Sequence, residues 1–284
     1  MPLLLLVSLI WAFSFGLIKD RLAGLDPTAL GVTRIALSAA VFLPALRLRK
    51  IPAFAVPRLM AIGAVEFGIM YLAYMAAFRH LAAHEVALFT IFTPLWLALL
   101  EAAAARRFAP RLAAAVLLAI AGAAVVCWRG FSTPGLAAGF VLVQVSNAAF
   151  AAGQFWYRRI RAALPPVPDS AVFGLLYLGA LAVTAAASVF TTDWGAFRPA
   201  PVQWLTLVYL GAVASGLCFF WWNLGATRVK LGTLAVFNNA KIPLGVAVAL
   251  LFFGESAHLP RLLAGGALLV LAIMVAERKQ SHAP

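Results

Sequence analysis

The chain has few charged residues and very few acidic ones. Only 11% of its 284 residues are charged, with nine Asp and Glu against 22 Lys and Arg, whereas soluble globular chains average about 25% charged residues. Hydrophobic residues reach 64%, against the roughly 45–50% of soluble domains. So few charges cannot cover the surface of a soluble fold of this length. The composition therefore excludes soluble, disordered and disulfide-scaffold classes and indicates a polytopic membrane protein.

Cysteine and the common catalytic signatures are scarce or missing. Cys127 and Cys218 both lie in apolar stretches, so no disulfide is expected. The sequence has no GxSxG, Walker A or CxxC motif. His80 and His84 are four residues apart with Glu85 adjacent, but no HExxH motif or third ligand accompanies them. We expect no cofactor, no metal and no enzymatic activity.

Long apolar runs divide the chain into ten helix-sized segments, six without any charge and four with one. Each approaches the about 20 residues that a helix needs to cross a bilayer, and none alternates like a transmembrane barrel strand. They are residues 1–18, 27–46, 59–78, 86–105, 112–128, 134–157, 170–192, 202–227, 231–254 and 262–276. We expect an all-α integral membrane fold with ten transmembrane helices.

Basic residues are distributed unevenly between the loops. With a cytoplasmic N-terminus, 14 of the 22 Lys and Arg residues fall on the inner side. Six fall on the outer side: Lys19, Arg21, Arg79, Arg129, Arg198 and Arg261. Inner loops are generally richer in Lys and Arg, so we expect both termini in the cytoplasm of a multi-pass protein of the inner or plasma membrane. The net charge of +13 then reflects topology and contact with anionic lipid, not nucleic-acid binding.

The chain repeats itself at a spacing of 149 residues. This offset places Arg79 on Arg228, and it also superimposes one mid-helix proline in each half. We expect one membrane domain built from two five-helix repeats, residues 1–130 and 131–284. Because five is odd, the second repeat crosses the membrane in the opposite sense. Inverted repeats of this kind place the binding site near mid-membrane, where the repeats meet.

Motifs in both halves resemble a known transporter family. They are Trp222-Asn223-x-Gly225-Ala226, Leu231-Gly232, Pro243 and Phe253-Gly254-Glu255 in the second half, and Trp11, Arg34, Ala77, Leu81-Ala82 and Pro94 in the first. Together they are similar to the EamA type of the drug/metabolite transporter superfamily. His84-Glu85-Val86 adds a likeness to its YddG-like branch of aromatic amino-acid exporters. The resemblance implies export of small metabolites, and it makes Trp11 a candidate substrate-binding residue.

Three ionisable residues, Arg34, Glu66 and Lys241, lie inside apolar segments. At 1.5 Å of rise per residue, Glu66 and Lys241 fall near the middle third of the bilayer. A charge there costs at least about 2.5–3.5 kcal/mol, so such a side chain faces a partner or a cavity. Either Glu66 and Lys241 form a structural pair, or they bind substrate or a proton. Arg34 lies nearer a helix end and is interpreted as structural.

Helical spacing places Asn238 and Lys241 on one face. The 149-residue offset aligns this face with Phe89, Phe92 and Trp96. If both faces line one cavity, an aromatic wall stands opposite an amide and an ammonium group, and all five residues are candidate substrate-binding residues. For the aromatic residues the alternative is plain packing between helices.

Two further stripes contribute candidates for the same cavity. Tyr71 and Tyr74 belong to an aromatic stripe, and Gln144 and Asn147 belong to a stripe of amides. Amide groups have no reason to face lipid, because each needs hydrogen-bond partners there. They either line a polar path or hold helices together.

These features favour a secondary transporter that works by alternating access. The expected substrate is a small amphiphilic metabolite, above all an exported amino acid with an aromatic or large apolar side chain. Pro94 and Pro243 lie in mid-helix, where proline weakens the helical ladder, and are candidate hinges. Alternatives are a permease for other metabolites or cationic drugs, and an intramembrane enzyme acting on lipid. The expected partners are a small molecule and the bilayer, without nucleic acid, and the oligomeric state stays open.

Overall fold

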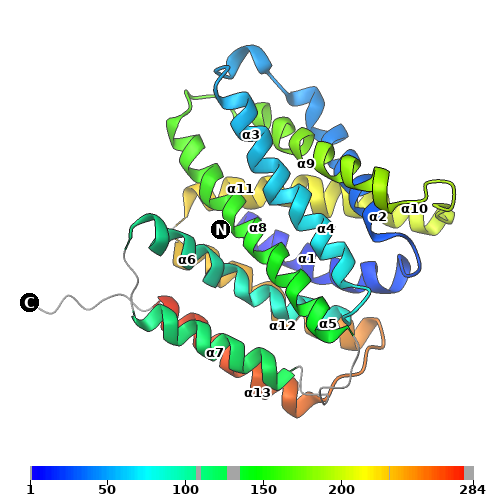
Figure 1. The fold of residues 1–284 in the computed structure, drawn as a ribbon, viewed down its shortest axis with the longest axis vertical. Helices are drawn as coiled ribbons and strands as arrows, with labels where there is room; N and C mark the ends of the chain where they lie inside the picture. The colour runs from blue at the N-terminus through cyan, green and yellow to red at the C-terminus, as the bar shows by residue number, and fades with distance from the viewer. Residues whose placement is uncertain (1, 107–109, 127–134, 230, 278–284) are drawn as a thin grey trace, which may run out of the picture.

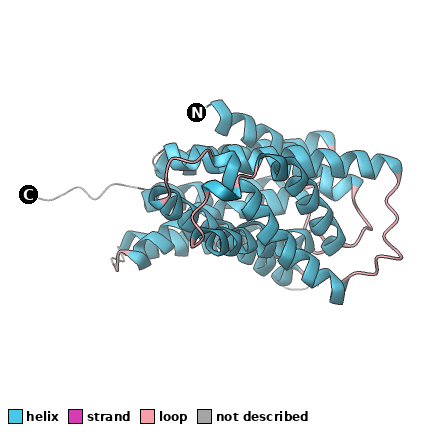
Figure 2. Ribbon diagram, turned by 90° about the horizontal axis from the view of Figure 1, so that it is seen from above, coloured by secondary structure: helices cyan, strands magenta, loops and turns pink. Residues whose placement is uncertain are grey.

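The computed structural model describes residues 2–106, 110–126, 135–229 and 231–277. In these ranges the chain is helical without any strand (Figures 1 and 2). Six residues used in the disulfide or orientation predictions lie outside the described residues: Arg107, Cys127, Arg129, Lys230, Arg278 and Lys279.

Figure 1 labels the helices in chain order. They are α1 (Pro2–Arg21), α2 (Pro27–Phe42), α3 (Ala55–Gly63), α4 (Met70–Ala77), α5 (Ala83–Phe89), α6 (Thr93–Ala104), α7 (Pro110–Val126), α8 (Leu136–Ala163), α9 (Asp169–Thr191), α10 (Pro201–Val208), α11 (Cys218–Arg228), α12 (Leu231–Phe252) and α13 (Leu259–Glu277). Two short 3₁₀ turns, Leu43–Ala45 and Leu48–Lys50, follow α2.

Seven helical stretches are long and apolar enough to cross a membrane. They are Leu3–Arg21, Pro27–Ala45, Ala55–Ala77, Ala83–Ala104, Leu136–Ala163, Asp169–Thr191 and Pro201–Arg228. Three shorter apolar helices lie within α7, α12 and α13. The prediction of an all-α, multi-pass membrane protein is confirmed. The full count of ten crossings stays a prediction, because seven stretches of the described residues meet both the length and the hydropathy expected of a crossing.

Three of the crossings are not regular α-helices, which the apolar runs did not predict. The π-helical segment Ala64–Ile69 joins α3 to α4, and a second, Tyr209–Leu217, joins α10 to α11. The 3₁₀ turn Thr90–Phe92 joins α5 to α6 just before Pro94, which lacks the N–H that would continue the ladder. Pro243, by contrast, lies inside the continuous helix α12. The two predicted hinges therefore differ in local structure.

Glycines allow α3 and α9 to approach closely. A Cβ atom on Gly63 would lie 1.9 Å from the Leu176 carbonyl oxygen, and one on Gly179 would lie 1.9 Å from the Met60 carbonyl oxygen. Small residues let membrane helices pack backbone to backbone in this way. This contact fixes the π-helical segment Ala64–Ile69 against α9.

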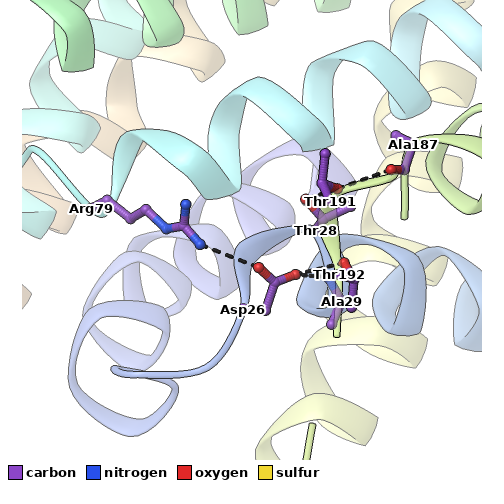
Figure 3. Close-up of polar contacts among 7 residues, drawn as sticks. All are labelled: Asp26, Thr28, Ala29, Arg79, Ala187, Thr191 and Thr192. Carbon is purple, nitrogen blue, oxygen red and sulfur yellow. Dashed lines mark hydrogen bonds and ion pairs between the residues drawn. The ribbon is translucent and has the colours of Figure 1, made fainter. Parts of the chain in front are cut away.

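A polar cluster ties three helix ends together at one end of the bundle (Figure 3). Asp26 caps α2 by accepting a hydrogen bond from the backbone N–H of Ala29 at 2.8 Å. The same carboxylate accepts a hydrogen bond from Thr192 at 2.8 Å and pairs with Arg79 at 3.2 Å. The loop before α2, the end of α4 and the end of α9 thus meet, on the side that the charge distribution predicts to be outside.

Contacts at the opposite end join the helix ends that the same prediction places inside. The backbone N–H of Arg47 donates to the Ala171 carbonyl at 3.1 Å, and Arg159 pairs with Glu101 at 3.2 Å. The helix ends therefore gather into two groups, as a set of membrane crossings requires.

Candidate functional site

A half-enclosed cavity lies between α1, α2, α4, α8, α11 and α12. Together with the open solvent at its mouth it contains about 550 Å³ of empty space. Its lining combines two cations with aromatic, hydroxyl and amide side chains: Trp11, Ser14, Phe15, Arg34, Met70, Tyr71, Tyr74, Thr90, Thr93, Ser146, Asn147, Phe150, Phe219 and Lys241. The cavity suits a small amphiphilic molecule.

Lys241 is the cation of α12. Its side chain is buried, and Nζ donates a hydrogen bond to Oδ1 of Asn238 at 3.0 Å, as the helical spacing predicted. Nζ also lies 4.9 Å from the ring centre of Trp11, where the π electrons attract a cation. Neither contact neutralises the ammonium group.

Arg34, the cation of α2, also reaches the cavity. It is buried, and its Nε and Nη2 atoms donate to Oγ of Ser215 at 3.2 and 3.0 Å. Its guanidinium group lies 4.9 Å from the ring centre of Tyr71. Arg34 therefore lines the cavity, and a purely structural role for it stays a prediction.

The two cations lack acidic partners. In the part of the chain that the structure describes, neither Arg34 nor Lys241 forms an ion pair, and the cavity lining contains no Asp or Glu. Buried charges without a counter-charge are costly. An anion in the cavity would offset that cost for both side chains.

The predicted amide stripe of α8 binds the broken helix α5–α6. Asn147 donates to the Phe89 carbonyl at 2.8 Å and accepts from Thr93 at 3.1 Å. Gln144 accepts from the indole N–H of Trp96 at 3.1 Å. The amides therefore hold helices together, and Asn147 also lines the cavity. At Asn147, therefore, the amide both lines a polar cavity and holds helices together, which were the two alternatives for this stripe.

The aromatic wall expected opposite Lys241 is built from other residues. Phe89 and Phe92 pack against Phe140, with ring centres 5.1 and 5.7 Å apart, and they do not line the cavity described above. The repeat offset predicted symmetry-related faces, but helix α8 covers this face of the first repeat. A substrate role for Phe89, Phe92 and Trp96 stays a prediction.

Three predicted aromatic residues, Trp11, Tyr71 and Tyr74, do line the cavity. Phe15, Phe150 and Phe219 join them there, and the sequence analysis missed these three. Helical spacing could have indicated two of them: Phe15 lies four residues after Trp11 and Phe150 lies three after Asn147, so each shares a face with a predicted residue.

Glu66 lies outside the cavity lining and does not pair with Lys241 among the described residues. Its carboxyl group is fully buried in the π-helical segment, and Oε1 accepts a hydrogen bond from Asn223 at 2.8 Å. The structural pair between Glu66 and Lys241 is therefore not formed in this conformation.

At the predicted outer end, Glu255 follows α12 and binds the start of α5. Its carboxylate accepts hydrogen bonds from the backbone N–H groups of Ala83 and His84 at 2.7 and 3.0 Å, and Oε2 lies 2.7 Å from Nδ1 of His84. Burial raises the pKa of Glu255, but the hydrogen bonds from His84 and Ala83 outweigh it and hold this pKa below its usual value. An ionised carboxylate therefore closes this contact between the two halves of the chain.

Comparison with known proteins identifies relatives along the whole chain. Residues 1–128 match the EamA-like transporter family. The chain is 41% identical over 277 residues to the probable biotin transporter of Pseudomonas aeruginosa, covering 97% of this chain and 96% of the relative. It is 37% identical to the biotin transporter of Escherichia coli K12, covering 98% and 93%, and 36% identical to that of Salmonella typhimurium, covering 97% and 92%.

A solved crystal structure has the same fold. It superimposes with a TM-score of 0.68 at 21% sequence identity and covers 97% of this chain and 95% of its own. Together with the apolar helices and the full-length relatives, this similarity agrees with the resemblance found in the sequence motifs. The chain belongs to the EamA-like transporter family and is a multi-pass membrane transporter of small molecules.

Proposed function

We propose that this transporter carries biotin. Biotin is an anion with a carboxylate at the end of an apolar chain and a fused ring that holds a cyclic urea. Three relatives with 36–41% identity over nearly the whole chain are named as biotin transporters. The cavity offers cations for the carboxylate, aromatic rings for the apolar part and hydroxyl or amide groups for the urea.

The observation that carries the proposal is the pair of buried cations without acidic partners in the described lining. Lys241 donates only to a neutral amide, and Arg34 donates to a hydroxyl group. A substrate carboxylate would form a charge-assisted hydrogen bond with Lys241, which is a strong type of contact. The urea carbonyl would then accept from the second cation or from Asn147.

The same lining argues against amino acids, the substrates expected from the sequence. An amino acid brings an ammonium group together with its carboxylate. Because the lining contains two cations and no Asp or Glu, this ammonium group would meet like charges without a counter-charge. Cationic drugs face the same repulsion. Biotin carries no positive charge, so the cavity favours it over both classes.

We further propose that ten crossings form two inverted repeats, residues 1–130 and 131–284, with both termini in the cytoplasm. The helix contacts support this, because they match when the halves are exchanged: α1 contacts α12, as α8 contacts α6, and α2 contacts the π-helical segment before α11, as α9 contacts the one before α4. Each half also places a π-helical segment in its third crossing. Pro94 and Pro243 would be the hinges of alternating access.

Orientation is tested with single cysteines introduced into a cysteine-free background. A cysteine at Arg198 should react with an impermeant thiol reagent in intact cells. A cysteine at Arg49 should react only after the cells are opened. The reverse pattern would overturn the proposed orientation.

The substrate is tested by counterflow. The full-length protein is reconstituted into liposomes loaded with unlabelled biotin, and entry of labelled biotin is followed. We expect labelled biotin to enter transiently, and we expect excess outside biotin, but not tryptophan or leucine, to block it. Protein-free liposomes control for leakage. Counterflow of tryptophan without counterflow of biotin would overturn the proposal and restore amino acids as substrates.

A further inference from the structure

Glu66 is a buried carboxyl group with unused hydrogen-bonding capacity. It is 0% exposed, its Oε1 atom accepts from Asn223, and its Oε2 atom has no partner among the described residues. It occupies the π-helical segment one turn before Met70, which lines the cavity. π-Helical segments inside longer helices are frequent at functional sites.

Further unpartnered polar atoms lie on the neighbouring helix α11. The indole N–H of Trp222 and Oδ1 of Asn223 are buried without a partner in the described structure. Trp222 packs on Trp11, with ring centres 5.1 Å apart, and Trp11 lies beneath the ammonium group of Lys241. Helix α11 therefore connects the cation of the cavity with the hydrogen-bond partner of Glu66.

In the ranges that the structure describes, Glu66 forms no ion pair. The segment packs against α3, α4, α8 and α9. The titratable groups that interact with Glu66 from these helices are Tyr157 of α8 and Tyr177 of α9. Each already donates its hydroxyl elsewhere, Tyr157 to Asp169 and Tyr177 to the Ser215 carbonyl. Helix α8 contacts Glu66 at Gly153, which has no side chain that could donate a hydrogen bond or a charge.

We propose that Glu66 binds a proton that crosses the membrane together with one biotin anion. The inference rests on the proposed transport of biotin. An ionised carboxylate without a counter-charge is strongly disfavoured in this setting, whereas a bound proton makes the group neutral. Release of this proton requires access to water, which the opening of the broken helices would provide.

Cotransport also balances the charge that moves. One biotin carboxylate and one proton carry no net charge together. Against a membrane potential of 100 mV, an anion that enters alone would reach an inside concentration about 50-fold lower than the outside concentration at equilibrium. The accompanying proton removes this effect of the potential. With an inward proton gradient the cycle gives uptake, opposite to the export expected from the sequence.

The positions suggest how substrate and proton are coupled. Phe219, which lines the cavity, and Asn223, which binds Glu66, lie one turn apart on α11, and the Asn223 amide also donates to the Phe219 carbonyl at 3.1 Å. A substrate that displaces Phe219 therefore moves the partner of Glu66. Occupancy of the cavity and of the proton site then change together.

The experiment uses proteoliposomes of the full-length protein, with wild type, Glu66→Gln, Glu66→Asp and Glu101→Gln. Glu101→Gln is the matched control, because Glu101 does not line the cavity and pairs with Arg159 near the surface. A pH gradient, acid outside, should make wild type and the control accumulate biotin at least tenfold over the level without a gradient. Glu66→Gln should lose this accumulation, and its biotin exchange should no longer respond to pH. Glu66→Asp should retain gradient-driven accumulation at a shifted pH.

A second measurement separates this inference from the choice of substrate. Infrared difference spectra of the purified protein between acid and alkaline pH should show the carbonyl band of a protonated carboxyl group, and Glu66→Gln should remove it. This band without biotin exchange in wild type would overturn the proposed substrate but retain the proton site. Gradient-driven accumulation in Glu66→Gln, dependence on Na⁺ in place of pH, or absence of the band would overturn the proton site.

Discussion

Asp26 and Glu66 are both carboxyl groups, but their surroundings differ. At the end of the bundle, Asp26 accepts from a backbone N–H and a threonine hydroxyl and pairs with Arg79 (Figure 3). In the middle, Glu66 has one amide partner and a carboxyl oxygen without any in the described structure. Removing either carboxyl group from water costs free energy. Only at Asp26 do hydrogen bonds and an ion pair within the described structure offset this cost.

The same difference separates the cations. Arg159 and Arg161, at the predicted inner end, each pair with an acidic residue. Lys241 and Arg34, in the cavity, do not pair in the described ranges. The described ion pairs therefore lie at the ends of the bundle, and the proposals above assign the cations and Glu66 in its middle to substrate and proton. Each prediction below tests one side of this division.

Among the variants below, the largest stability effect is expected beside Glu66, where α8 packs closely against it. In Gly153→Ala, the added Cβ atom would lie 2.1 Å from Cβ of Glu66. Overpacking of this kind costs about 1–3 kcal/mol, so we expect a clear fall in the thermal midpoint in detergent. Gly266→Ala is the matched control, because nothing lies within 4 Å of its added atom. Equal midpoints for the two variants would show that α8 is not packed tightly against Glu66.

A smaller effect is expected at the edge cluster. Asp26→Ala removes a helix cap and an ion pair, and loss of a cap typically costs about 1 kcal/mol. The midpoint should fall, while the KM for biotin should stay unchanged, because the cluster does not line the cavity. Asp26→Asn retains a capping group and should lose less. A raised KM for biotin in Asp26→Ala would contradict the claim that residues at the end of the bundle stabilise the fold without affecting substrate binding.

The smallest effect is a pH dependence at Glu255. Its pKa in the folded protein lies below the ordinary value of 4.5, so the ionised group stabilises the fold above about pH 4.5. This contribution is lost as the pH falls through the folded-state pKa. Thermal midpoints measured from neutral to acid pH should fall less steeply in Glu255→Gln than in wild type. Parallel curves would show that the contact with His84 and Ala83 does not stabilise the fold.

The helical membrane fold was predictable because long uncharged runs leave few alternatives. Lys241 and Glu66 were also predictable as buried groups, since a lone charge in such a run is conspicuous. The wall of the cavity was not, because nearly every face of these helices is apolar and the sequence does not mark which face meets which neighbour. Phe89 and Phe92 illustrate this: α8, through Asn147 and Phe140, covers them.

The π-helical segments were unpredictable for a related reason. Ala64–Ile69 contains no proline, and the close contact of Gly63 with α9 that precedes it is not marked in the sequence. The amino-acid substrate stays a prediction, and the proposal of biotin in its place depends on charges whose position the sequence did not give. Arg34 was expected at a helix end, and once it lies in the cavity beside Tyr71 the lining becomes cationic.

The central claim is that a cation in mid-membrane binds the carboxylate of biotin. Its most direct test measures binding of biotin and of its uncharged methyl ester to wild type, Lys241→Met and Lys50→Met, the last removing an exposed lysine outside this cavity. Hydrogen bonds to a charged group contribute about 1.5–3 kcal/mol, so Lys241→Met should weaken biotin about tenfold to a hundredfold and leave the ester nearly unchanged. Lys50→Met should change neither. Equal weakening of biotin and ester in Lys241→Met, or no weakening of biotin, would contradict the account.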